Sequence, residues 1–178
     1  MKTLETARLI LRNFSENDLH DFYAYASVPG VGEMAGWPHH TSIEVTREVL
    51  NSFLNHDEVY ALVHKDTQKV IGSLGVHARN EHNANEREIG YVLSKDYWGQ
   101  GYTPEAVNRV IQHLFNETSI DILTCAHFSH NNQSKRVIEK TGFTYSHTAK
   151  YTSKLLNTTF DSLRYTLTKT QAQRTKKN

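Results

Sequence analysis

A glycine-containing segment near the middle of the chain has the residue types of a phosphate-binding loop. It reads Tyr-Trp-Gly-Gln-Gly-Tyr-Thr-Pro-Glu-Ala over residues 97–106. Its glycines let the backbone bend sharply and approach a ligand closely, and successive main-chain N–H groups at a helix start attract anions. A tight connection without a ligand is the alternative interpretation. The predicted phosphate-binding residues are Gly99, Gln100, Gly101, Tyr102 and Thr103.

The elements on either side of this loop must position it. We expect Thr103 to cap the following helix and Pro104 to take its first position, where a missing N–H costs nothing. From Ala106 onward, apolar residues recur at helical spacing. A strand is predicted at residues 88–93, and Gly90 inside it marks a bulge or a close approach of a ligand.

Two other nucleotide-binding fingerprints do not fit the loop. A Walker A loop requires Gly-Lys-Ser/Thr after its glycines, and the chain contains no such run. A Rossmann loop requires a third glycine at the helix start, where this chain has Thr103 and Pro104. The sequence therefore indicates neither an ATPase nor a dehydrogenase.

The loop resembles the acyl-coenzyme A pyrophosphate loop of the GNAT superfamily of N-acetyltransferases, whose motif is Arg/Gln-x-x-Gly-x-Gly/Ala. Aligned on its glycine, the motif falls on Trp98, Gly101 and Thr103, so its first and last positions differ from the pattern. The fuller string Tyr-Trp-Gly-x-Gly-Tyr-x-x-Glu-Ala is similar to the RimJ/RimL-like branch. Further blocks that resemble this branch lie at residues 5–12, 36–40, 88–91, 131–134 and 139–143.

The alternation of predicted strands and helices indicates an α/β or α+β domain. The resemblance implies a mixed, largely antiparallel central sheet of six to seven strands, flanked by about four helices and splayed at the fourth and fifth strands. A Thr-Ser-Ile-Glu capping box at residues 41–44 should open a helix that buries Ile43, Val49, Leu50, Phe53 and Leu54. Strands are expected at residues 8–14, 58–64, 70–78, 88–93, 120–127, 143–147 and 163–168, and helices at 16–27, 41–54, 104–115 and 131–142.

Length and composition are compatible with such an enzyme. The 178 residues suit one domain over residues 1–170, followed by a basic polar tail at 171–178. A net charge of +1 gives no reason to expect a nucleic acid or a membrane as a partner, and a cytoplasmic location is expected. Cys125 is expected to be a buried strand residue rather than a nucleophile. The spacing of the 11 histidines predicts no metal site.

Acetyl transfer from a thioester to an amine requires a base, stabilisation of an oxyanion and a proton for the leaving thiolate. The resemblance implies that the pantetheine arm of acetyl-coenzyme A lies beside the strand at 88–93, where Tyr91, Val92 and Leu93 bind it through main-chain groups. It also implies a contact from Asn131 to the pantetheine, although helix capping alone would explain an asparagine there.

Candidate residues for proton transfer are few. Glu88 is the predicted base, with Glu86 on the same strand face, and the alternative for both is a solvated carboxylate. Many GNAT members carry a tyrosine seven residues after the asparagine, where this chain has Ile138. Ser134 is therefore the candidate acid and coenzyme contact; the alternative is that Ser134 only hydrogen-bonds backbone or coenzyme and that water protonates the thiolate.

The acceptor is expected to be a primary amine, either a protein or peptide N-terminus or a small-molecule amine. Trp37, His39 and Glu86 are the predicted acceptor-binding residues, and a packed aromatic with exposed imidazoles is the alternative for the first two. We expect direct attack in a ternary complex, in a monomer or a homodimer. The alternatives are a coenzyme-binding sensor of the same fold that has lost catalysis, and a nucleic-acid binder using the basic tail.

Overall fold

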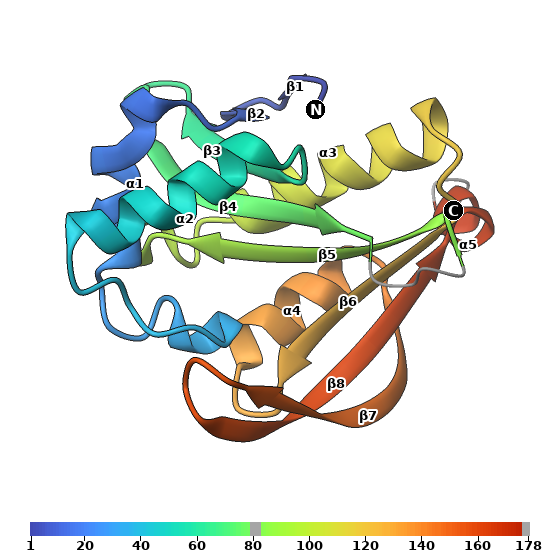
Figure 1. The fold of residues 1–178 in the computed structure, drawn as a ribbon. Coiled ribbons are helices and arrows are strands. Elements are labelled where there is room, and N and C mark those ends of the chain that lie inside the picture. Colours follow the sequence, from blue (N-terminus) through green and yellow to red (C-terminus); the bar gives the residue numbers. More distant parts are fainter. Residues whose placement is uncertain (79–82, 176–178) are drawn as a thin grey trace.

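The computed structural model describes residues 1–78 and 83–175. Within these residues, one sheet has the strand order β1-β2-β3-β4-β5-β6-β8-β7 (Figure 1). Neighbouring strands are antiparallel except β5 and β6, which are parallel. The predicted mixed, largely antiparallel sheet is confirmed, with eight strands instead of six to seven. The strands are β1 (Leu4–Glu5), β2 (Leu9–Asn13), β3 (Val59–His64), β4 (Val70–His77), β5 (Glu86–Leu93), β6 (Ile122–Phe128), β7 (Thr144–Ser153) and β8 (Thr158–Thr168).

Near the two ends of the sheet, one strand was not predicted and two were predicted too short. Strand β1 has two residues, too few to produce an alternating pattern. Strands β7 and β8 form a long hairpin, whereas only residues 143–147 and 163–168 were predicted. Strand β7 is an edge strand whose only buried residue is Ser153. Its polar and exposed side chains therefore carry no apolar periodicity.

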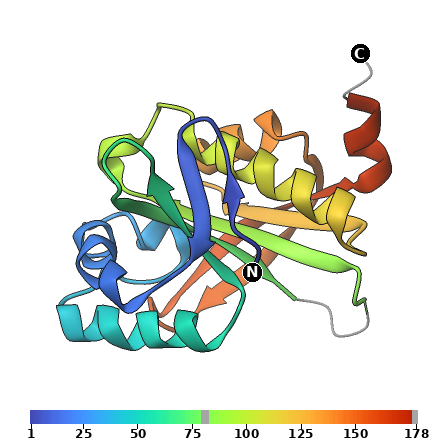
Figure 2. The same cartoon turned by 90° about the horizontal axis from the view of Figure 1, so that it is seen from above.

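Helices cover both faces of the sheet. Figure 2 shows α1 and α2 on one side and α3 and α4 on the other. One buried cluster contains residues of α1 and α2, and the other is built around α3. The helices are α1 (Leu19–Ala26), α2 (Ile43–Asn55), α3 (Tyr102–Glu117), α4 (Asn132–Lys140) and α5 (Lys169–Thr175), with short 3₁₀ turns η1 (Glu16–Asp18), η2 (Glu33–Ala35) and η3 (Lys95–Tyr97).

The structure corrects several predicted helix details. The N-cap of α2 is Ser42 and not Thr41, because Ser42 is the extended residue whose hydroxyl accepts a bond from Val45 N at 3.4 Å. Leu54 is 39 % exposed, since it lies on the outer side of α2, and is not buried as predicted. The first predicted helix is split between η1 and α1.

The predicted splay is confirmed between β5 and β6, the fourth and fifth strands expected from the sequence. Their pairing runs from Glu86↔Ile122 to Ile89↔Cys125 and then stops. From Gly90 to Leu93, β5 remains paired only with β4. The two parallel strands therefore separate in the middle of the sheet, which leaves main-chain groups of β5 free to face a ligand.

Near the end of the chain, residues 169–175 form α5, which includes part of the predicted basic polar tail at 171–178. The rest of the predicted tail, residues 176–178, lies outside the described residues, as do residues 79–82. None of the helices described by the structure has the length and apolar character needed to span a bilayer.

Candidate active site

A cleft of about 600 Å³ lies along the separation of β5 and β6. One end is formed by the loop before α3 and the start of α4, and the other by the floor of β4 and β5 with aromatic side chains above it. Most sequence-predicted site residues meet in this cleft, although they come from four separate segments. Those that line it are Trp37, Glu88, Tyr91, Val92, Leu93, Gly99, Gly101, Tyr102, Thr103, Asn131 and Ser134. Glu86, His39 and Gln100 are not among its lining residues.

The loop before α3 has the backbone of an anion cradle. Gly99 and Gly101 have φ values of +74° and +82°, in the left-handed region that favours glycine. Gly101, and not Thr103, is the N-cap of α3, so Pro104 is the third helical residue rather than the first. The helix begins earlier than predicted because Gly101 makes the left-handed turn. Pro104 still costs nothing, because the first N–H groups of a helix have no intrahelical partner.

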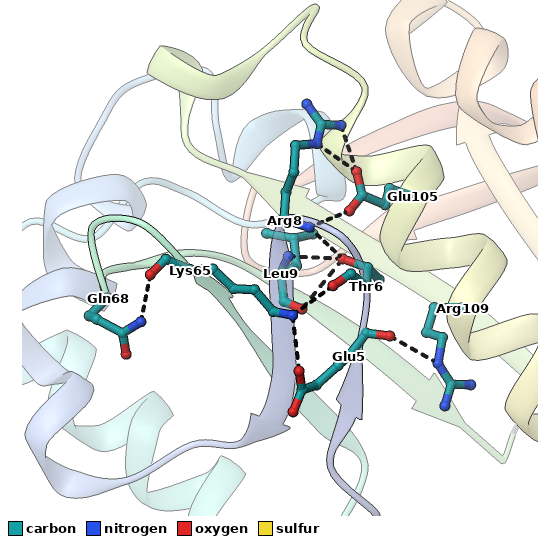
Figure 3. Close-up of polar contacts among 8 residues, drawn as sticks. All are labelled: Glu5, Thr6, Arg8, Leu9, Lys65, Gln68, Glu105 and Arg109. Atoms are coloured by element: carbon teal, nitrogen blue, oxygen red, sulfur yellow. Dashed lines mark hydrogen bonds and ion pairs between the residues drawn. The ribbon is translucent and has the colours of Figure 1, made fainter.

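Arg8, which lies in the connection between β1 and β2, binds this loop and the first turn of α3. Its Nε donates to Glu105 Oε2 at 2.7 Å, and Nη2 lies 2.6 Å from the same oxygen. Its Nη1 donates to the Gln100 carbonyl at 3.0 Å, and the guanidinium lies 4.1 Å from the centroid of the Tyr102 ring. Figure 3 shows Arg8 reaching from the connection between β1 and β2 to Glu105 at the start of α3.

These contacts have two consequences for an anion in the cradle. In a planar trans peptide the C=O and the next N–H point in opposite directions. The Gln100 carbonyl bound to Arg8 therefore turns the Gly101 N–H away from Arg8. Arg8 also neutralises Glu105, which would otherwise repel an anion at the same helix start. Burial raises the pKa of Glu105, but hydrogen bonds from Thr6 and Arg8 outweigh it and lower the pKa.

This role of Arg8 was not predicted from the sequence. Arg8 and Glu105 are 97 residues apart, and no local pattern connects them. The main-chain N–H of Arg8 donates to Glu105 Oε1 at 3.0 Å, so both oxygens of the carboxylate are held.

The start of α4 brings Asn131, Ser134 and Tyr91 together. Asn131 caps the helix, as predicted, by accepting a hydrogen bond from Ser134 N at 3.0 Å. The Ser134 hydroxyl lies 2.9 Å from the Tyr91 hydroxyl, which comes from β5. Burial raises the pKa of Tyr91 well above its ordinary value, so the phenol stays protonated. This hydroxyl pair was not foreseen, because Tyr91 was expected to contribute main-chain atoms only.

The two predicted carboxylates differ in their placement. Glu88 faces the cleft, and its Oε2 accepts a hydrogen bond from Arg164 Nη1 at 3.1 Å. Glu86 lies outside the lining, with its carboxylate 3.4 Å from Asn83 Nδ2. Cys125 is buried on β6, as predicted, and burial raises the pKa of its thiol to about 12. A thiol in this state is a poor nucleophile at neutral pH.

The end of the cleft formed by β4 and β5, called the acceptor half below, has a floor of paired residues from these two strands. The cross-strand pairs are Ser73↔Val92, Gly75↔Gly90 and His77↔Glu88, and all six residues line the cleft. Val59, Phe53, Trp37, Met34, Phe128 and Tyr151 contribute apolar surface around this floor. His77 was not identified from the sequence, because an isolated histidine at a strand end gives no local signal.

The segment at residues 30–39 places Trp37 at the cleft, and several hydrogen bonds hold the segment in position. Glu33 accepts hydrogen bonds from Gly30 N at 2.7 Å and from His39 N at 3.1 Å, and lies 2.8 Å from His39 Nδ1. His39 therefore holds the segment together instead of lining the cleft. Asn131 Nδ2 donates to Met34 O at 3.2 Å, which links the segment to α4.

Glu33 makes the stability of this segment depend on pH. Burial raises the pKa of Glu33, but the hydrogen bonds from His39 and Gly30 outweigh it and lower the pKa to about 2. A lowered pKa means that the stabilisation is complete above the ordinary value and is lost as the pH falls toward 2. We expect Glu33→Gln to lower the melting temperature at pH 7. The difference in melting temperature between the variant and the native chain should become smaller as the pH falls from about 4.5 to about 2.

The Glu33 side chain is 34 % exposed, so solvent screens the interaction and the difference should be small. Thermal unfolding of both proteins across this pH range measures it. A difference that stays constant with pH would show that Glu33 acts through packing and not through its charge.

Within residues 1–78 and 83–175, no group of three or more His, Cys, Asp or Glu residues is arranged to hold a metal ion.

Known proteins resemble this chain in sequence and fold. A model of the acetyltransferase (GNAT) domain matches residues 8–144. The uncharacterized N-acetyltransferase YoaA of Bacillus subtilis (strain 168) is 28 % identical over 145 residues, which cover 79 % of this chain and 81 % of YoaA.

Solved structures agree in fold at lower sequence identity. An acetyltransferase of the GNAT family from Bacillus anthracis superposes with a TM-score of 0.86 at 20 % identity, covering 95 % of this chain and 99 % of that chain. RimL, described as a ribosomal L7/L12 α-N-protein acetyltransferase in complex with coenzyme A, superposes with a TM-score of 0.79 at 20 % identity, covering 94 % and 98 % of the two chains. The domain match, the splayed sheet and the glycine cradle before α3 together identify the chain as a member of the GNAT acetyltransferase family.

Proposed function

We propose that this protein is an N-acetyltransferase of the RimJ/RimL-like branch that transfers the acetyl group of acetyl-coenzyme A to a primary amine. The observation that carries the proposal is the continuity of the cleft. It joins an anion cradle at the start of α3 to an apolar acceptor pocket and passes through the splay of β5 and β6 between them.

The coenzyme would be held mostly by main-chain atoms. The N–H groups of Gly101, Tyr102 and Thr103 are available to the diphosphate, because they stand at the start of a helix. The pantetheine would run along β5 from Leu93 toward Tyr91, where the strand has left β6. This arrangement fixes the thioester relative to the acceptor without a covalent enzyme intermediate.

Direct attack in a ternary complex then needs few side chains. An N–H of β5 near Tyr91 would face the developing oxyanion. Ser134, held by Asn131 and close to the Tyr91 hydroxyl, would supply a proton to the leaving thiolate. Glu88, fixed by Arg164, presents a carboxylate in the acceptor half. Trp37 and the neighbouring apolar residues would exclude water from the amine.

The role of Ser134 can be tested by removing its hydroxyl. We expect Ser134→Ala to lower kcat about 10-fold or more while the Kd for acetyl-coenzyme A changes less than about 3-fold, because proton donation contributes to the transition state and little to binding. Steady-state kinetics and calorimetry measure the two quantities. An unaltered kcat would assign protonation of the thiolate to water.

A protein or peptide N-terminus is the acceptor that the neighbouring structures favour. RimL is described as an acetyltransferase of a protein α-amine. An α-amine has an ordinary pKa near 8 and loses its proton more easily than a lysine side chain near 10.4. Small amines remain the second class of acceptor to test.

The function is tested by thiol release from acetyl-coenzyme A with three sets of amines: peptides with free N-termini, the same peptides with blocked N-termini, and small polyamines. We expect turnover with at least one free amine, and mass spectrometry should find an added acetyl group. Tight coenzyme binding without turnover on any amine would instead support a sensor of the same fold. No coenzyme binding would reject both.

A further inference from the structure

Two glycines face each other across the floor of the acceptor half. Gly75 of β4 is directly opposite Gly90 of β5, and both line the cleft. A Cβ built on Gly90 would meet no heavy atom of the described residues within 4 Å, so the space above it is open. A Cβ on Gly75 would lie 2.2 Å from Nε2 of His77, so the imidazole already covers that glycine. Nε2 of His77 therefore borders the open space above Gly90.

The other ring nitrogen of His77 is held by a carboxylate. Nδ1 lies 3.0 Å from Oε2 of Glu58, which directly precedes β3. An ionised carboxylate can only accept, so Nδ1 carries the hydrogen and Nε2 of the neutral ring keeps its lone pair. The two side chains are 37 % and 47 % exposed, so a proton that reaches Nε2 can pass on to water.

Nε2 lies against Gly75, in the part of the cleft where the reaction would occur. Gly90 is the first residue of β5 beyond the last pair with β6, Ile89↔Cys125. Residues directly opposite in an antiparallel sheet are about 4.5–5.5 Å apart. An amine in the space over Gly90 would thus be within reach of Nε2, directly or through one water.

Of the residues that the structure describes, Glu58, Glu88 and Arg164 bring charge close to this imidazole. Glu58 binds its Nδ1, and Glu88 is its cross-strand neighbour on β5. Arg164 of β8 lies behind Glu88 and donates to its carboxylate at 3.1 Å. Glu88 is therefore already engaged with a cation, whereas Nε2 of His77 lies over Gly75 at the floor of the cleft.

We propose that His77, oriented by Glu58, takes the proton from the ammonium group of the acceptor, and that Glu88 with Arg164 positions the acceptor. This inference rests on the acetyl-transfer function proposed above. The ammonium loses one proton to Nε2, and its nitrogen attacks the thioester carbonyl to form the C–N bond. Collapse breaks the C–S bond, and the second proton of the nitrogen ends on the thiolate through Ser134 or water. The proton on His77 leaves to solvent.

The decisive variant is His77→Gln, which retains a polar side chain of similar reach. We expect kcat/KM for the amine to fall at least about 10-fold, which is less than the roughly 100-fold or more typical of acid–base catalysis, because water can replace part of the function. The Kd for acetyl-coenzyme A, measured by calorimetry, should not change. His147→Gln is the matched control, because His147 is exposed on β7 outside the cleft lining, and its kcat/KM should equal that of the native chain.

Two further measurements separate proton transfer from a structural effect. In His77→Ala, added imidazole should restore part of the turnover, since it can occupy the vacated space. In His77→Gln, kcat/KM should follow the fraction of free amine and rise about tenfold per pH unit up to the pKa of the acceptor. Glu58→Gln should lower kcat/KM by a smaller factor and should not respond to imidazole, because His77 is still present.

The possible failures are distinguishable. A native chain that releases no thiol with any amine rejects the acetyl-transfer function, and the role of His77 with it. A native chain that turns over while His77→Gln does so at the same rate rejects His77 alone and leaves the function intact. A loss of turnover in His77→Ala without any response to imidazole would also contradict proton transfer by this residue.

Discussion

Gly101→Asp is expected to weaken acetyl-coenzyme A binding about 1000-fold while the protein still folds. The substitution places a carboxylate in the loop that would bind a diphosphate, and Arg8, which is already paired with Glu105, offsets only part of its charge. Two unit charges about 4 Å apart near a protein surface interact with roughly 4 kcal/mol, and like charges make this term repulsive. The φ of +82° at this residue adds some backbone strain, which aspartate tolerates better than most residues.

The matched control is Gly101→Asn. Asparagine has nearly the same size and backbone cost as aspartate but no charge, so it separates strain from repulsion. A Cβ at this position would meet only Arg8 Nη2, at 3.6 Å, which is an ordinary contact. Calorimetry should find asparagine within about 10-fold of the native affinity. Equal affinities for the aspartate variant and the native chain would contradict a diphosphate site at this loop.

Arg8→Met should weaken coenzyme binding about 100-fold, although Arg8 itself is placed behind the loop. Methionine keeps much of the aliphatic length but releases the Gln100 carbonyl and leaves Glu105 without its cation. The Glu105 side chain is only 20 % exposed, so water screens its charge incompletely. Its repulsion of the diphosphate would then act at the start of α3.

A second substitution isolates the electrostatic part of this effect. Adding Glu105→Gln to Arg8→Met removes the uncompensated charge, and the affinity should recover to within about 10-fold of the native value. Both variants should melt at lower temperature than the native chain, because both lose the ion pair. If the double variant binds as weakly as Arg8→Met, then Arg8 does not act by neutralising Glu105.

Some features of this protein follow from short stretches of its sequence. The glycines at 99 and 101 predict a bend before a helix because few other residues adopt positive φ without strain. Asn131 predicts the start of α4 because its side chain can satisfy a free N–H of the first turn. Apolar spacing predicts the buried stripe of α3. Each of these signals is local and depends on residues within one or two turns.

Predictions from local patterns were wrong for the start of α3, where another residue makes the turn, and for the length of β7, whose side chains are exposed. Gly101 begins α3 two residues before the predicted cap, because a left-handed glycine makes the turn that Thr103 was expected to follow. Strand β7 was predicted at half its length, since an edge strand with exposed side chains does not alternate.

The sequence by itself determined the glycine loop, the Asn131 cap and the order of most strands and helices, because these depend on backbone preferences of neighbouring residues. Only the tertiary structure decided which distant side chains meet. Arg8 reaches Glu105 across 97 residues, and Arg164 reaches Glu88 across 76. The position of His77 over Gly75, beside the open space at Gly90, depends on strand register and on the absence of two side chains. Such contacts arise from the packing of the whole sheet, so no short pattern can encode them.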